Sequence, residues 1–116
     1  MKIVWRELKL NNQKVQAQIT INEEGDRIQI KASSVGSDLT TFGPKSEWDE
    51  LFFLDFSQGN GVFKVYEIKH EWIYSHNVNK SQTFKEQQAQ GRRPRFSITK
   101  DIIIPKNLKP VKILKL

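Results

Sequence analysis

Two segments in the first third of the chain alternate between apolar and polar residues. In residues 14–21 (KVQAQITI) every second side chain is apolar, and residues 27–33 (RIQIKAS) repeat the pattern. Such alternation predicts β-strands with one buried and one polar face. The intervening residues 22–26 (NEEGD) have the composition of a turn, and Gly25 is free to adopt a positive φ. The two segments therefore predict an antiparallel hairpin.

A second hairpin is predicted after a loop. Residues 34–46 contain two glycines and a proline, which favour a loop. Residues 49–56 (DELFFLDF) are almost continuously apolar, and this predicts a central strand covered on both faces. The sequence SQGNG (57–61) is typical of a hairpin connection, and residues 62–70 (VFKVYEIKH) are the expected return strand.

The second half of the chain has a different character. Residues 80–91 are rich in helix-forming residues, with Ser81 as the expected N-cap and Gly91 at the end. Residues 92–98 are expected to form a loop and a short extended piece, and residues 108–116 a last strand. The elements together predict an α+β fold. Its sheet has four to five strands, mainly antiparallel or mixed, and one or two helices flank it.

Length and composition limit the class of protein. We expect residues 1–116 to form a single domain. No stretch approaches the roughly 20 apolar residues that a membrane helix needs. The absence of cysteine excludes disulfides, thiolate zinc sites and a cysteine nucleophile. These features fit a cytoplasmic protein without a membrane segment.

The chain is basic, with 19 Lys and Arg against 13 Asp and Glu. The excess lies mainly in residues 80–116, whereas residues 23–26 and 47–50 are locally acidic. An uneven basic surface favours a polyanion partner, most commonly DNA or RNA. The expected nucleic-acid contacts are the basic side chains Lys80, Lys85, Arg92, Arg93 and Arg95.

Gln29 and Lys31 stand two residues apart and therefore share one face of their predicted strand. In metal-dependent phosphodiester hydrolysis an oxygen ligand helps to hold the divalent ion, while a lysine orients the attacking water and offsets phosphate charge. By spacing alone, the pair is more typical of a solvated strand face.

The order of several segments resembles a known family. IQIKAS, a loop with FGP, WDELFFLDF and VFKVYEI follow one another as in the core of restriction endonucleases of the PD-(D/E)xK superfamily, in the branch with a QxK motif. The later run KSQTFKEQQAQGRRPRFSI is similar to the C-terminal part of small bacterial type II restriction endonucleases. The resemblance spans residues 13–116.

This resemblance implies a Mg²⁺-dependent DNA endonuclease of a restriction–modification system, built on a restriction-endonuclease-like core. Gln29 would be a metal-site ligand and Lys31 the catalytic lysine. Small enzymes of this type commonly dimerise, because cutting both strands needs two sites. The resemblance thus implies DNA as the partner and a homodimer as the assembly.

The family also has an acidic residue on the preceding strand, where this sequence offers only Gln16, Gln18 or Thr20. Asp55, in the apolar strand, is the candidate to replace it as a catalytic and metal-binding residue, because a buried carboxylate needs a partner. A second subunit that completes the site is an alternative. If neither supplies the acid, the chain is an inactive nucleic-acid-binding module. A protein-interaction subunit with a basic surface is the third reading.

Other residues leave further alternatives open. With pairing centred near residue 59, Asp49 would lie opposite Lys69 and near Glu67, as a divalent-ion site or an ordinary cross-strand ion pair. Trp72 and Tyr74 would either stack on bases or pack at the rim of the core. The two histidines, residues 70 and 76, lack the spacing of a zinc hydrolase motif.

Overall fold

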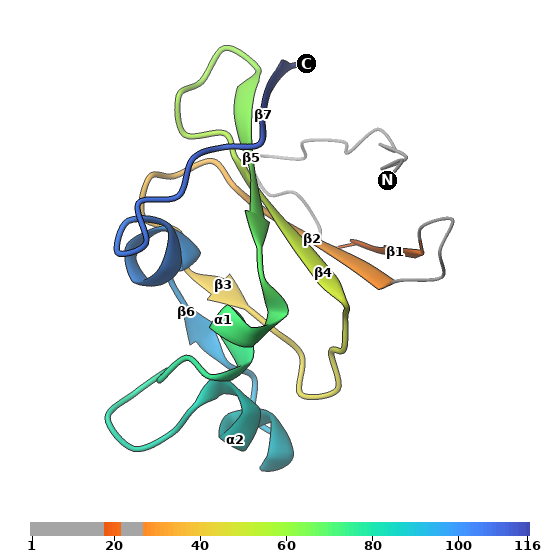
Figure 1. Cartoon of the computed structure of the whole chain (residues 1–116), viewed down its shortest axis with the longest axis vertical. Helices are drawn as coiled ribbons and strands as arrows, with labels where there is room; N and C mark the ends of the chain where they lie inside the picture. The colour runs from red at the N-terminus through yellow and green to blue at the C-terminus, as the bar shows by residue number, and fades with distance from the viewer. Residues whose placement is uncertain (1–17, 22–26) are drawn as a thin grey trace.

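The computed structural model describes residues 18–21 and 27–116, and side-chain burial from residue 27 onward. Its centre is a five-stranded mixed sheet with the strand order β1-β2-β4-β5-β7, and strands β3 and β6 form a separate two-stranded ribbon (Figure 1). The elements are β1 (Gln18–Ile21), β2 (Arg27–Ser33), β3 (Thr40–Thr41), β4 (Glu50–Asp55), β5 (Val62–Ile68), α1 (His70–Tyr74), α2 (Phe84–Ala89), β6 (Arg95–Phe96), the π-helical turn η1 (Thr99–Ile103) and β7 (Lys112–Lys115). None of the described helices is long and apolar enough to cross a membrane.

Both predicted hairpins are confirmed. Strands β1 and β2 pair antiparallel, and so do β4 and β5, with Leu51 opposite Ile68. The connection of the second hairpin turns through Gly59, Asn60 and Gly61, which all have positive φ angles, as glycine and asparagine tolerate. Residues 14–17 of the first predicted strand and residues 22–26 of its turn lie outside the described residues.

The two hairpins join through strands β2 and β4, which run parallel. In this register Gln29 lies opposite Leu51, Lys31 opposite Phe53, and Ser33 opposite Asp55. The predicted last strand is present as β7, which pairs antiparallel with β5. The sheet is therefore mixed, as predicted. Its parallel pair requires a crossover, and the ribbon strand β3 lies within that connection.

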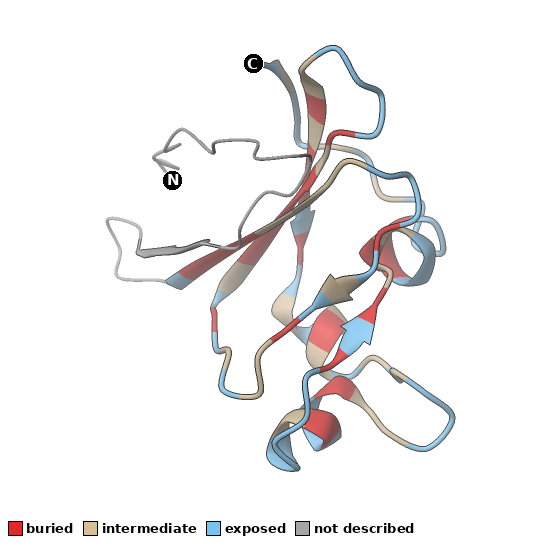
Figure 2. Ribbon diagram, turned by 180° about the vertical axis from the view of Figure 1, so that it is seen from behind, coloured by how far each residue is buried: buried red, intermediate tan, exposed pale blue. Residues whose placement is uncertain are grey.

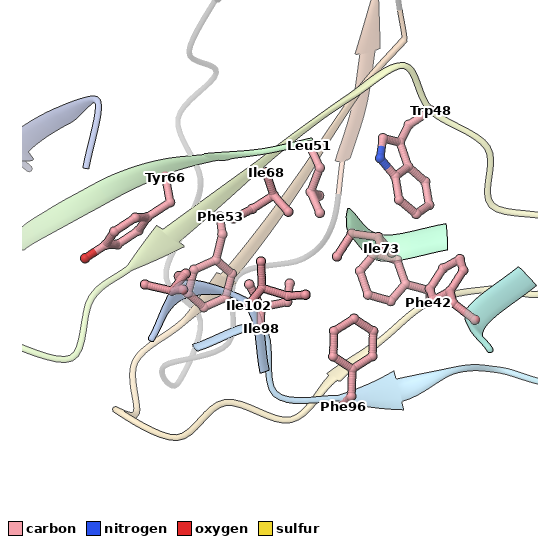
Figure 3. Close-up of a cluster of buried hydrophobic side chains, with 12 residues drawn as sticks. Phe42, Trp48, Leu51, Phe53, Tyr66, Ile68, Ile73, Phe96, Ile98 and Ile102 are labelled. Atoms are coloured by element: carbon pink, nitrogen blue, oxygen red, sulfur yellow. The ribbon is translucent and has the colours of Figure 1, made fainter. Parts of the chain in front are cut away.

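Strand β4 is buried on both faces, as its apolar sequence predicts. Leu51 and Phe53 belong to one buried cluster, and Phe52 and Leu54 to another on the opposite face of the sheet. The first cluster also includes side chains from α1, α2, the ribbon and η1, so these elements cover the same face of the sheet (Figure 3).

Aromatic rings occupy much of this first cluster. The Phe42 ring stacks on Trp48 with a centroid distance of 5.2 Å and on Phe96 at 5.9 Å. It also meets Phe84 edge-on at 5.0 Å. Phe42 follows β3 and Phe96 belongs to β6, so the stacked rings fix the ribbon against the core.

Helix α2 is shorter than predicted and begins at a different cap. The Thr83 side chain accepts a hydrogen bond from the Glu86 backbone, and the Glu86 carboxylate accepts one from the Thr83 backbone. Ser81, the predicted cap, instead donates to Asn79 Oδ1 at 3.1 Å in the preceding turn. The prediction of Ser81 was therefore wrong, because the capping box two residues later satisfies more backbone donors. Gly91, with φ 74°, follows the helix as predicted.

Candidate active site and nucleic-acid interface

Lys31 points from strand β2 toward the β3–β6 ribbon. Its Nζ donates a hydrogen bond of 2.8 Å to the carbonyl oxygen of Thr41 and lies 4.8 Å from the centroid of the Phe42 ring. Burial lowers the pKa of the Lys31 ammonium below its ordinary value of 10.5. A lysine has three N–H donors. Thr41 accepts one of them, which leaves two for a ligand.

A depression of about 200 Å³ opens beside Lys31. It is lined by Lys31, Ala32, Ser33, Asp38, Leu39, Thr40 and Thr41, which come from the end of β2, the following loop and β3. Its lining is more polar than apolar. The depression therefore presents the Lys31 ammonium on a polar surface that also holds the Asp38 carboxylate.

Asp38 fixes the ribbon beside this depression. Its carboxylate accepts hydrogen bonds from the Thr40 and Ser97 hydroxyls and from the backbone N–H groups of Ile98 and Thr99, at 2.6 to 3.0 Å. Burial acts to raise the pKa of Asp38, but the hydrogen bonds from Thr40, Thr99 and Ile98 outweigh it, so the pKa lies below its ordinary value. Because four donors already occupy the carboxylate, Asp38 anchors the site and is not an open ligand.

Gln29 is almost fully buried, with 3% of its surface exposed. Its Oε1 accepts a hydrogen bond of 3.1 Å from the Ser46 hydroxyl. The Ser46 carbonyl in turn accepts one of 3.0 Å from Gln88 Nε2 on helix α2. The amide of Gln29 is therefore enclosed and bonded within the fold.

Two of the predicted arginines lie beside residues 41–43, the segment whose Thr41 carbonyl binds Lys31. Arg95 on β6 is exposed and pairs with Thr41, whose carbonyl binds Lys31. Arg93 is also exposed and its Nη1 lies beside Gly43, 3.8 Å from where a Cβ would stand. Figure 2 shows the ribbon on the side of the molecule that faces the viewer, with an exposed residue next to a buried one along β6. The pairing of Thr41 with Arg95 thus joins segments more than 50 positions apart in one ribbon.

The other predicted contacts lie near helix α2. Lys80, Lys85 and Arg92 are exposed, and Arg92 Nη1 donates to Gln82 Oε1 at 3.2 Å. Three glutamines of this region form hydrogen bonds within the protein. Gln87 and Gln90 bond to Gln82, and Gln88 bonds to the carbonyls of Gly43 and Ser46.

Asp55 lies at the end of β4, opposite Ser33 and Lys64. Its Oδ1 accepts a hydrogen bond of 2.8 Å from the Ser57 backbone. The strand register separates it by four residues from the position opposite Gln29, or about 13 Å along the strand at the usual rise. The structure therefore does not bring Asp55 and Gln29 together, and Asp55 lies closer to Lys31.

The predicted pairing of Asp49 with Lys69 was wrong. The hairpin register is displaced by one residue from a centre at residue 59, and Asp49 precedes β4. Asp49 Oδ2 instead accepts a hydrogen bond of 2.7 Å from the Arg27 backbone and lies 3.6 Å from Arg27 Nε. Lys69 Nζ lies 5.5 Å from the centroid of the Trp72 ring.

The aromatic candidates Trp72 and Tyr74 both pack against the core. Tyr74 donates a hydrogen bond of 3.4 Å to the Ser46 carbonyl and packs against the core, so its role is structural. His70 stacks on Tyr74 with a centroid distance of 4.0 Å. Trp72 also packs against the core but is only partly buried.

A Mg²⁺ site needs several oxygen ligands in one place. Within residues 18–21 and 27–116, no three acidic or histidine side chains gather closely enough to hold a metal ion. Gln29 is enclosed, and the Asp38 carboxylate already accepts four hydrogen bonds. Asp55 lies four strand positions from the residue opposite Gln29. The described residues therefore do not by themselves fit the divalent ion that the resemblance implies.

The mixed sheet and the short helices are compatible with a restriction-endonuclease-like core. Residues 3–105 match the family described as Bsp6I restriction endonuclease. Over 87 residues the chain is 42% identical to the type II restriction enzyme Bsp6I of Bacillus sp. (strain RFL6), and the alignment covers 72% of this chain and 50% of that relative. The chain belongs to the Bsp6I restriction endonuclease family, which confirms the resemblance to small type II restriction endonucleases.

The chain spans about half the length of the curated relative that it matches. No solved structure matches it significantly.

Proposed function

We propose that this chain binds duplex DNA and takes part in hydrolysing its phosphodiester bonds. The observation that carries the proposal is the position of Lys31. Its half-buried ammonium faces a polar depression and is bonded to the strand that pairs with Arg95. A candidate catalytic lysine on β2 and a candidate DNA contact on β6 are thus linked through Thr41 of β3, in a chain that belongs to a restriction endonuclease family.

In this proposal Lys31 offsets charge on the scissile phosphate and orients the attacking water. The bond to Thr41 holds the ammonium in place before the substrate arrives, so little reorganisation is needed when charge develops. Arg93 and Arg95 hold neighbouring phosphates or the edge of a guanine, because a guanidinium can donate two parallel hydrogen bonds. Lys80, Lys85 and Arg92 extend the contact toward α2.

The family's dependence on Mg²⁺ and its use of two subunits are further parts of the proposal. Since the described residues do not complete a metal site, the missing carboxylates would come from residues outside the described ranges or from another subunit. A homodimer would place one Lys31 at each DNA strand. We also propose a cytoplasmic location, because that is where a restriction endonuclease meets foreign DNA.

The test is a cleavage assay on mixed-sequence duplex DNA at low salt, with and without Mg²⁺ or Mn²⁺. We expect metal-dependent cutting that Lys31→Ala abolishes and Lys64→Ala retains, since Lys64 is a partly buried lysine of the same sheet, on strand β5. Binding to the same duplex should survive in Lys31→Ala. Binding without cutting by the unaltered chain would contradict the hydrolytic part of the proposal, and no binding at low salt would contradict all of it.

A further inference from the structure

A second cationic site lies on helix α1 and the segment after η1. Trp72 is approached by two ammonium groups, with Lys106 Nζ 4.7 Å and Lys69 Nζ 5.5 Å from its ring centroid. Residues 69 and 106 are far apart in sequence, and the fold brings both to one ring. We call these three residues the Trp72 clamp. The indole ring restrains both charges near one point of the surface.

The clamp borders a hollow of about 520 Å³. The hollow is lined by Trp72, Ser75, His76, Asn77, Asp101, Ile102, Pro105 and Lys106. It shares no lining residue with the depression beside Lys31. His76 packs on Phe96, whose side chain points to the opposite side of β6 from Arg95. The hollow is therefore separate from the Lys31 site.

The charges of this hollow favour an anion. Its one carboxylate, Asp101, lies 3.1 Å from His76 Nε2 and is engaged there. Neither Lys69 nor Lys106 forms an ion pair with a carboxylate in the part of the chain that the structure describes. Two restrained ammonium groups without acidic partners, of which Lys106 lines the hollow, leave a positive charge that a ligand can neutralise.

We propose that the Trp72 clamp binds the phosphodiester backbone of DNA outside the cleavage site. The proposal rests on the proposed function in taking DNA as the polyanion. The basic excess of the chain continues past the clamp, with an exposed lysine at 109. Phosphate contacts of this kind add affinity and position the duplex without reading its sequence.

The experiment measures the dissociation constant for a long mixed-sequence duplex by fluorescence anisotropy, from about 50 to about 200 mM salt. The clamp variant is Lys69→Gln with Lys106→Gln. The matched control is Lys112→Gln with Lys115→Gln, which removes the same charge from exposed residues of β7. Each lost phosphate contact lowers the salt slope by about one. We therefore expect a slope lower by about two in the clamp variant and a much smaller change in the control.

Trp72→Ala and Trp72→Phe provide a second readout. If the ring restrains the two ammonium groups, Trp72→Ala weakens DNA binding and Trp72→Phe largely retains it. An equal loss in the clamp and control pairs would show diffuse attraction and overturn the clamp. Unchanged binding by the clamp variant would also overturn it while leaving the proposed function intact. Absence of DNA binding by the unaltered chain would overturn both proposals together.

Discussion

Lys31 Nζ and the carbonyl oxygen of Thr41 lie 2.8 Å apart, and this hydrogen bond joins the middle of the sheet to the two-stranded ribbon. Thr41 pairs with Arg95, so the ammonium and the guanidinium are positioned by adjacent strands. The same bond partly offsets the cost of burying a charged lysine. Changes at Lys31 should therefore affect both folding and DNA cleavage.

The stability of the chain should depend on pH through Lys31. Burial lowers its pKa in the folded state below the ordinary 10.5. Between the pKa of Lys31 in the folded state and 10.5, its pKa in the unfolded chain, the unfolded chain binds more protons. The free energy of unfolding therefore rises with pH in this range. Lys31→Met should lack this rise. Urea titrations from neutral pH to about pH 10.5 should show the stability of the unaltered chain increasing relative to Lys31→Met. A constant difference across this range would contradict the lowered pKa.

Asp38→Asn should be strongly destabilising. Asp38 accepts backbone hydrogen bonds from Ile98 on one oxygen and from Thr99 on the other, so either orientation of an amide would place an NH₂ group against an N–H donor. We expect a loss of about 2–3 kcal/mol in the free energy of unfolding at neutral pH. Glu71→Gln, an exposed carboxylate on α1, is the matched control and should change little.

The contribution of Asp38 to the free energy of unfolding should also depend on pH. Its pKa is lowered in the folded state, so its stabilisation is present above the ordinary value of 3.8 and is lost as the pH falls through the folded pKa. The difference between the unaltered chain and Asp38→Asn should narrow on acidification below about pH 3.8. Denaturant titrations at neutral and acidic pH measure this difference, and a gap that widens in acid would exclude the proposed anchoring by an ionised carboxylate.

Gln88→Ala should destabilise the loop of residues 43–46, whose Ser46 is bonded to Gln29. Gln88 Nε2 donates to the carbonyls of Gly43 and Ser46, and the Ser46 hydroxyl donates to Gln29. Loss of both donations should cost about 1–2 kcal/mol. Lys85→Ala, at an exposed position of the same helix, is the control for helix propensity. Thermal unfolding of the two variants measures the difference in stability. Equal melting temperatures would show that the two hydrogen bonds to the loop do not stabilise the fold.

Thr83→Ala should destabilise helix α2 by about 1 kcal/mol, because it removes the side-chain acceptor of the capping box. Ser81→Ala should cost less, since Ser81 lies in the preceding turn and bonds to Asn79. Chemical denaturation of both variants ranks the two positions. A greater loss of unfolding free energy in Ser81→Ala than in Thr83→Ala would support Ser81 as the N-cap, as the sequence predicts.

Much of the architecture followed from the sequence alone. The alternating segments around residue 25 and the apolar segment at 49–56 specified two hairpins, because side-chain direction alternates along a strand and only one pattern buries the apolar residues. The order of the motifs also predicted the restriction endonuclease family, which the comparison confirms. The position of Lys31 on a strand needed no tertiary information.

The tertiary structure decided which of these residues meet. Periodicity does not identify the neighbour of a strand, so the parallel pairing of β2 with β4, which separates Gln29 from Asp55, was not predictable. Strands β3 and β6 have two residues each, too short for a periodic signal, yet their pairing places Arg95 opposite Thr41, the hydrogen-bond partner of Lys31. Asp38 and Gln88 act through partners more than 40 residues away. Their roles depend on long-range packing, which local sequence patterns do not encode.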